Sequence, residues 1–399
     1  MSVLFNHWSY RNLWRRVVSV KNLRRAFRRI RMKGEKALGS DGESIAAWSG
    51  KLLQRLHAVN AELLIGDYEP REIKECWISE HGKKRRIAVL CLRDRVVAKA
   101  CCQVLSEVFD SRFNTVNFAY RPRRNRSQAA LYCKQLIKSG ARYWVKADIK
   151  DCFGSIRRRR LSGLIKRLLC RNTEPDLIRL LDLFVSLERR PRGIVQGGTL
   201  SPFFANLYLD EIDSSLSKEG YLFAHYGDDF VIGCRSQKDA ELAMQFIREQ
   251  AQQISLELND KSRIVQVSET DGLGFCGFDI RPEFISLTSQ SVKRMQTKAG
   301  RMVDEFFDSG AAERLQNHRD LVNEYGGLRF TRGRSLERKG KRLLKEPAIT
   351  NFEKTPLPKY QLYLSSWLEQ HEIVDNSALN QAIEPVLKLV EEKEKSLFE

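Results

Sequence analysis

The chain has 399 residues, enough to bury more than one core, which predicts more than one domain. Its 69 lysines and arginines outnumber its 50 aspartates and glutamates, so the formal charge is +19 at pH 7. This excess favours a polyanionic partner, of which nucleic acid is the first candidate. The basic residues are clustered, which argues against a generally basic soluble protein; the clusters lie at 24–33, 83–86, 121–126, 157–160 and 189–192.

The nine cysteines show no paired CxxC spacing. This pattern predicts a reduced compartment and argues against a disulfide framework or a zinc site. The N-terminus has no signal-peptide layout, and no apolar run approaches the roughly 18 residues of a membrane span. We expect a cytoplasmic protein without a membrane partner.

The first 33 residues are aromatic and basic. Leu23, Phe27 and Ile30 recur at helical spacing between arginines, which predicts a basic amphipathic helix. Its arginines are candidates for gripping RNA or template, with a solvated helix face as the alternative; the candidates are Arg24, Arg25 and Arg28. A second helix is expected from about Ile45 to Leu64.

Residues 68–92 have the composition of short strands around a basic turn. Lys84 and Arg85 on this hairpin are candidate ligands for an incoming triphosphate, although the signal is weak by itself. An apolar helix is expected from Arg93 to about Phe109. Arginines alternate with aromatic residues over 117–126, which suits either a nucleic-acid surface or a plain loop; the candidate contacts are Arg121, Arg123 and Arg124.

Two acidic positions carry the chemical argument. A predicted strand at 143–149 contains Asp148, and two apolar strands at 222–226 and 230–234 flank Gly227-Asp228-Asp229 in a predicted hairpin. Clustered carboxylates repel one another unless a cation lies between them. Two-metal phosphoryl transfer uses carboxylates from adjacent strands around two Mg²⁺ ions about 3.5–4 Å apart. The alternatives are a strand-end cap for Asp148 and a solvated Asp-Gly turn.

The segment 192–202 between these acids is rich in glycine. Gly197 and Gly198 would let the backbone approach a ligand closely. Thr199 is the expected cap of a helix with Pro202 in its first turn, an arrangement that often cradles nucleotides. Further along, Ser236 predicts another helix start, residues 273–278 predict a Gly-punctuated strand pair, and helices are expected from about Val292.

Together these segments resemble a reverse transcriptase of the group II intron-like branch, over about residues 22–278. The matching motifs, in chain order, are 21–27, 39–42, Gly82-Lys83-Lys84-Arg85, 93–97, Tyr120-Arg121-Pro122, Ala147-Asp148-Ile149-Lys150, Gln196-Gly197-Gly198-Thr199-Leu200-Ser201-Pro202 and Tyr226-Gly227-Asp228-Asp229. The resemblance implies an α+β right-hand polymerase with fingers, palm and thumb, an antiparallel palm sheet and a helical thumb. Its parts would be an N-terminal extension and fingers (1–120), a palm (121–283, with part of the fingers at about 157–195) and a thumb (284–399).

The resemblance also implies catalytic roles. Asp148 and Asp228 would ligate two Mg²⁺ ions, for which Mn²⁺ can substitute. Asp229 would assist, the Ile149 carbonyl would complete a metal shell, and Lys261 would be the general acid for pyrophosphate. Phosphoryl transfer depends mainly on positioning and charge neutralisation, which such groups supply.

Nucleotide and primer contacts are implied in the same way. Lys84 and Arg85 would hold the phosphates, Phe153 would exclude a ribose 2′-OH, and Gln196 with Gly197 would contact nucleotide and template. The implied primer grip consists of Gly274, Phe275, Cys276, Gly277 and Phe278.

Two departures from the family pattern are Gly227 in place of the commoner Ala, and Arg86 in place of Pro. No maturase-like Gly-Trp-x-x-Tyr-Phe stretch or HNH nuclease signature follows Phe278, so we do not expect splicing or intron mobility. We expect RNA-directed DNA synthesis from dNTPs and a DNA primer on a dedicated noncoding RNA, in bacterial antiphage defence. The alternatives are a free-standing group II intron-like or CRISPR-associated reverse transcriptase, an RNA-dependent RNA polymerase, and a non-catalytic RNA-binding maturase-like protein. Template, priming mode, oligomeric state and trigger stay open.

Overall fold

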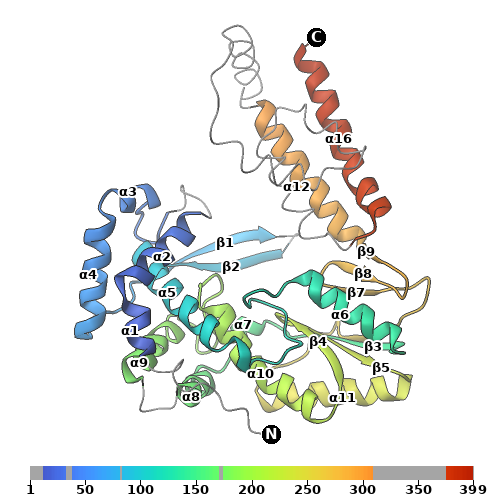
Figure 1. Ribbon diagram of the computed structural model, residues 1–399, viewed down its shortest axis with the longest axis horizontal. Coiled ribbons are helices and arrows are strands. Elements are labelled where there is room, and N and C mark those ends of the chain that lie inside the picture. The colour runs from blue at the N-terminus through green and yellow to red at the C-terminus, as the bar shows by residue number, and fades with distance from the viewer. Residues whose placement is uncertain (1–11, 33–37, 81–82, 170–173, 309–373, 399) are drawn as a thin grey trace. The chain divides into compact units, whose positions relative to one another are not determined.

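The computed structural model describes residues 12–32, 38–80, 83–169, 174–308 and 374–398 (Figure 1). The chain divides into two compact units. The first combines residues 1–125 with 141–265, and the second combines 126–140 with 266–399. The boundaries of these units differ from those predicted for fingers, palm and thumb. The predicted domain boundaries therefore stay predictions.

The first unit is built around a four-stranded sheet in the order β4-β5-β3-β6. Its strands are β3 (Tyr143–Asp148), β4 (Leu222–Tyr226), β5 (Asp229–Cys234) and β6 (Arg263–Gln266). Strand β5 runs antiparallel to both β3 and β4. The helices α10 (Ser201–Lys218) and α11 (Gln237–Gln253) pack against this sheet. The predicted α+β class with an antiparallel palm sheet is confirmed.

The start of α10 differs from the prediction. Its N-cap position is Leu200, without a side-chain cap. The hydroxyl of Ser201 instead donates to the Val195 carbonyl at 2.5 Å, which ties the helix start to the preceding loop. Thr199 is therefore not the cap, whereas Ser236 caps α11 as predicted by accepting from the Asp239 amide at 3.1 Å.

Four N-terminal helices pack next to α5 (Leu92–Val108): the first two contact α5, the fourth contacts the first two, and the third contacts the fourth. They are α1 (Leu13–Val18), α2 (Val20–Arg31), α3 (Ile45–Gly50) and α4 (Leu52–Ile65). The single helix expected from Ile45 to Leu64 is wrong, because the chain leaves helical geometry at Lys51, after Gly50 with its low helix propensity. Next to these helices lies the antiparallel ribbon of β1 (Lys74–Glu80) and β2 (Lys83–Val89) (Figure 1). The other helices among the described residues of this unit are η2 (Asp110–Arg112), α7 (Cys152–Ser155), α8 (Arg158–Leu168) and α9 (Pro175–Val185).

The second unit contains a three-stranded antiparallel sheet, β7 (Leu273–Phe275), β8 (Phe278–Ile280) and β9 (Ile285–Leu287). Helix α6 (Arg126–Lys138) contacts β8, and α12 (Ser289–Asp308) packs along α16 (Asn376–Phe398). The helices expected between 309 and 373 lie outside the described residues. Within the described part of the chain, no helix combines the length and apolarity that crossing a membrane requires.

Candidate active site

The sheet register brings the three predicted carboxylates to one end of the sheet. Asp148, the last residue of β3, pairs with Asp229, the first residue of β5. Beyond this pair, the Ile149 amide donates to the Asp228 carbonyl at 3.0 Å. Directly opposed residues of an antiparallel pair project to the same face, and opposed like charges are destabilising. The strand register therefore places the three aspartates close together, and their mutual repulsion lowers the stability of the fold.

A two-residue turn, Gly227-Asp228, connects Tyr226 to its partner Asp229. Gly227 has φ +75°, the conformation that such tight hairpin turns require of their first residue. Tyr120 lies over the turn: a Cβ added to Gly227 would be 3.6 Å from the Tyr120 hydroxyl. The sequence placed Tyr120 in a motif but gave no sign of this contact.

The electrostatics of the site reflect crowding of the acids. Asp229 lies at an exposed strand end, yet desolvation by the protein around it, followed by the charges of Asp228 and Asp148, raises its pKa to about 7. Burial and the charge of Asp228 also raise the pKa of Tyr120 to about 12. Carboxylates that resist ionisation together have the chemistry of a cation site.

These residues fit Mg²⁺ as donors, although they do not form a closed cage. Among the described residues, no three acidic, histidine or cysteine side chains already converge as a metal site. Mg²⁺ in nucleotidyl-transfer sites is usually held by one or two carboxylates together with water and substrate phosphates. The arrangement of Asp148 and Asp228 agrees with that open type of site.

The loop before β6 is tied to the same end of the sheet. The Asn259 amide donates to the Asp148 carbonyl at 2.7 Å, and the Asp148 amide donates to the Ser262 hydroxyl at 3.2 Å. Between these two residues lies Lys261, whose amide donates to the Asn259 side chain at 3.2 Å. Lys261, the predicted general acid, is thus exposed on a loop whose neighbouring residues hydrogen-bond to the backbone of Asp148.

The β1–β2 ribbon rests on the glycine-rich loop. The Ala88 amide donates to the Gln196 carbonyl at 2.8 Å. Gly197 has φ +96°, and a Cβ there would lie 2.5 Å from Cγ2 of Ile87. The close approach predicted at this glycine is therefore made by strand β2, and the contacts of Gln196 and Gly197 with nucleotide stay predictions.

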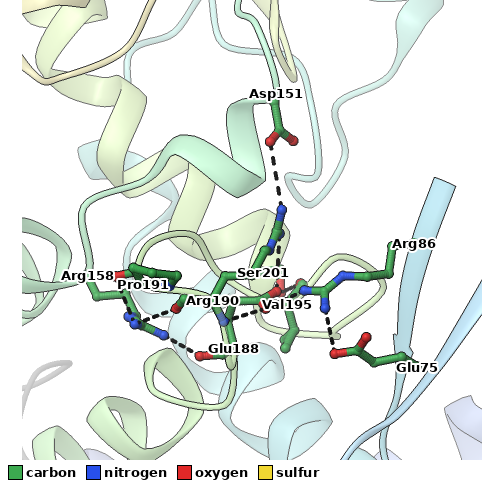
Figure 2. A network of polar contacts seen from close by, with 9 residues as sticks. All are labelled: Glu75, Arg86, Asp151, Arg158, Glu188, Arg190, Pro191, Val195 and Ser201. Carbon is green, nitrogen blue, oxygen red and sulfur yellow. Dashed lines mark hydrogen bonds and ion pairs between the residues drawn. The ribbon is translucent and has the colours of Figure 1, made fainter.

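An ionic network centred on the buried Glu188 contacts the same ribbon (Figure 2). Arg86 of β2 bonds Glu75 at 2.5 Å and also Glu188, a residue only 3% exposed. Although burial opposes ionisation, hydrogen bonds from Arg190 and Arg86 lower the pKa of Glu188 to about 2. Arg190 also lies 3.9 Å from the Asp151 carboxylate. The network links β2 to the segment that follows Asp148. In the sequence, its only sign was Arg86 at a position where the family usually has Pro.

The other predicted nucleotide ligands lie around this ribbon. Lys84 and Arg85 are exposed on β2, opposite Ser79 and Ile78. Phe153 is half-buried on α7, and its carbonyl accepts from the Ile194 amide at 2.9 Å. These positions leave the predicted phosphate contacts and the 2′-OH exclusion open to test.

The predicted nucleic-acid arginines fall into two groups. Arg24, Arg25 and Arg28 are exposed on α2 and border a cavity of about 730 Å³, as the amphipathic pattern predicts. Arg123 is also exposed, whereas Arg124 is half-buried and donates to the Thr115 carbonyl at 2.8 Å.

Arg121 corrects the prediction made for it. Its side chain is 4% exposed and bonds the Asp110 carboxylate at 2.8 Å. It also donates to the carbonyls of Asn114, Asn117 and Asp110. These bonds connect Arg121 to the segment 110–117, so Arg121 is a buried structural residue and not a surface contact for nucleic acid.

The predicted primer grip lies in the second unit. Phe275 pairs with Phe278 across a turn of Cys276 and Gly277, and both phenylalanines are buried. The Gly277 carbonyl accepts from the Ser291 hydroxyl at 2.8 Å. The role in holding a primer stays a prediction.

Comparison with known proteins identifies the class. The family described as "Reverse transcriptase (RNA-dependent DNA polymerase)" matches residues 74–280, just over half of the chain. The chain belongs to this family, whose members use divalent metal ions, and the predicted recognition is confirmed.

Individual relatives agree with the family. Protein YkfC of Escherichia coli is 27% identical over 300 residues, covering 61% of this chain and 76% of that protein. The group II intron-encoded protein LtrA of Lactococcus lactis is 27% identical over 170 residues, covering 40% of this chain but only 28% of LtrA. The retron Mx162 reverse transcriptase of Myxococcus xanthus is 26% identical over 205 residues, covering 47% and 39% respectively.

Proposed function

We propose that this chain is a catalytically active RNA-directed DNA polymerase whose chemistry takes place at Asp148, Asp228 and Asp229. The observation that carries the proposal is the register that pairs Asp148 with Asp229 beside the Asp228 turn. An acid cluster costs stability without a cation, which a purely RNA-binding role would leave unexplained.

In this proposal Asp148 and Asp228 would hold two Mg²⁺ ions, with Asp229 assisting and the Ile149 carbonyl as a further oxygen ligand. The ions would supply charge neutralisation for attack by a primer hydroxyl on a dNTP. Lys84 and Arg85 bind the triphosphate from β2, and Phe153 excludes a 2′-OH. Lys261 protonates the departing pyrophosphate from the loop that carries Asn259 and Ser262.

The test is primer extension on an RNA template with dNTPs, using Asp228→Asn with Asp229→Asn. We expect extension to be lost while RNA binding is retained, because the amides keep the shape of the acids without their charge. Exposed Asp271→Asn is the matched control and should extend normally. Extension that survives in the double variant would favour the RNA-binding class, and equal use of rNTPs would favour an RNA polymerase.

We further propose that the template is a dedicated noncoding RNA and that the DNA product serves bacterial antiphage defence. The exposed arginines of α2 beside a cavity support an RNA grip, and a retron reverse transcriptase is among the relatives. Purification from the native genomic context, followed by sequencing of bound RNA and DNA, tests the template. One abundant RNA with complementary DNA, together with phage resistance lost in the Asp228 variant, is expected. Heterogeneous RNA without DNA would instead favour a free-standing intron-like or CRISPR-associated enzyme.

A further inference from the structure

His225, the residue two positions before the Gly227-Asp228 turn, is fully buried and engaged on both ring nitrogens. Its Nδ1 lies 3.0 Å from Oδ2 of Asp213, and its Nε2 lies 2.8 Å from the Gly227 carbonyl oxygen. His225 and Asp213 are each 0% exposed. The ring therefore spans from helix α10 to the carbonyl that immediately precedes Asp228.

The two partners determine the protonation of the ring. A carbonyl oxygen can only accept, so Nε2 must carry a proton. Opposite an ionised Asp213 carboxylate, which also only accepts, Nδ1 carries a second proton, and the ring is then an imidazolium. Burial opposes this charge, yet the charge and hydrogen bond of Asp213 and the bond to Gly227 raise the pKa of His225 above its usual value. The other charged groups that act on the ring are Asp210 on α10 and Asp229 on β5.

The backbone and the ring plane of His225 are also held. Its amide donates to the Val116 carbonyl at 3.0 Å, and its carbonyl accepts from the Phe118 amide at 2.9 Å. The imidazole stacks on Phe230, with ring centroids 4.2 Å apart and planes 8° apart. Phe230 directly follows Asp229, so the ring contacts the chain on both sides of the acids.

We propose that His225 is a positioning residue: its imidazolium, charge-paired with Asp213, fixes the Gly227 carbonyl and thereby the position of Asp228 beside Asp148. The catalytic part of this inference rests on the proposed polymerase function. The protonation of His225 and its pairing with Asp213 are independent of that function.

The first test is spectroscopic and needs no activity. In protein labelled with ¹⁵N-histidine, the His225 signals are assigned by their loss in His225→Gln. At a pH about one unit above the ordinary histidine pKa of about 6.5, both ring nitrogens should show protonated shifts. The signals of exposed His57 in the same spectra serve as the internal reference. A neutral single tautomer at His225 would overturn the proposal, whether or not the protein polymerises DNA.

The second test separates charge from shape. In Asp213→Asn the amide can still hydrogen-bond the ring, but it no longer compensates an imidazolium. We expect kcat of primer extension to fall about 10–100-fold, as for other residues that orient metal ligands. KM for dNTP should stay within about twofold, because substrate contacts are intact. His225→Gln should lose at least as much, and the double variant no more than the worse single variant, because the two residues act as a pair. His57→Gln is the matched control.

Two outcomes would overturn the positioning role. One is full kcat in Asp213→Asn together with a neutral ring at position 225, which would make the charge irrelevant. The other is a loss of kcat in proportion to a loss of folded protein, measured by thermal unfolding of the same variants, which would make the pair a stabilising core contact only.

Discussion

The contact between the glycine-rich loop and strand β2 predicts a sharp difference between two glycine substitutions. Gly197 and Gly220 both have positive φ, +96° and +76°, so alanine at either position is strained by about 1–2 kcal/mol. At Gly220 a new Cβ meets nothing within 4 Å. At Gly197 it would lie 2.5 Å from Cγ2 of Ile87 and 3.2 Å from the Ala88 carbonyl oxygen.

Ile87 cannot easily yield, because its branched side chain is restricted at χ1 and the second neighbour is backbone. Overpacking of this kind costs about 1–3 kcal/mol. We therefore expect Gly197→Ala to lose about 2–5 kcal/mol of unfolding free energy in total, against about 1–2 kcal/mol for Gly220→Ala. Because β2 carries Lys84 and Arg85, Gly197→Ala should also raise KM for dNTP.

Urea unfolding and primer extension of both variants provide the assay. Equal destabilisation by the two alanines would refute the argument that β2 forces glycine at this position. An unchanged KM for dNTP in a destabilised Gly197→Ala would separate the packing argument from the proposed phosphate role of the ribbon.

The remaining predictions concern charged groups. Because the pKa of Asp229 is about 7 when folded and 3.8 ordinarily, its contribution to stability is full below about pH 4 and is lost as pH rises through 7. Metal-free Asp229→Asn should flatten that part of the stability profile, and a parent protein with an unaltered profile would contradict this. Glu188→Gln should cost about 1–3 kcal/mol, because Arg86 and Arg190 lose a charged hydrogen-bond partner but stay partly exposed and Arg86 keeps Glu75. Exposed Glu72→Gln should cost less than about 1 kcal/mol in the same unfolding assay. Arg121→Ala should lower stability, and Arg123→Ala should instead weaken RNA binding at low salt; a reversed pattern in melting and binding experiments would show that Arg121 is misassigned.

Several features could be predicted from sequence because their causes are local. The Gly227-Asp228 turn follows from apolar strand residues around a Gly-Asp step, and Gly227 adopts the positive φ that the turn needs. The exposed arginines of α2 follow from the helical spacing of Leu23, Phe27 and Ile30, which are buried. The motif combination likewise predicted the family.

Local sequence patterns were therefore enough to predict the class of protein, the strand-turn-strand unit that carries the acids, and the basic face of α2. The contacts of individual residues depend instead on the packed fold. It placed Asp148 opposite Asp229, buried Arg121 against Asp110, gave the space above Gly197 to Ile87, and joined His225 to Asp213. Periodicity and turn chemistry act over a few residues, whereas these contacts depend on strand register and packing, which chain neighbours do not encode.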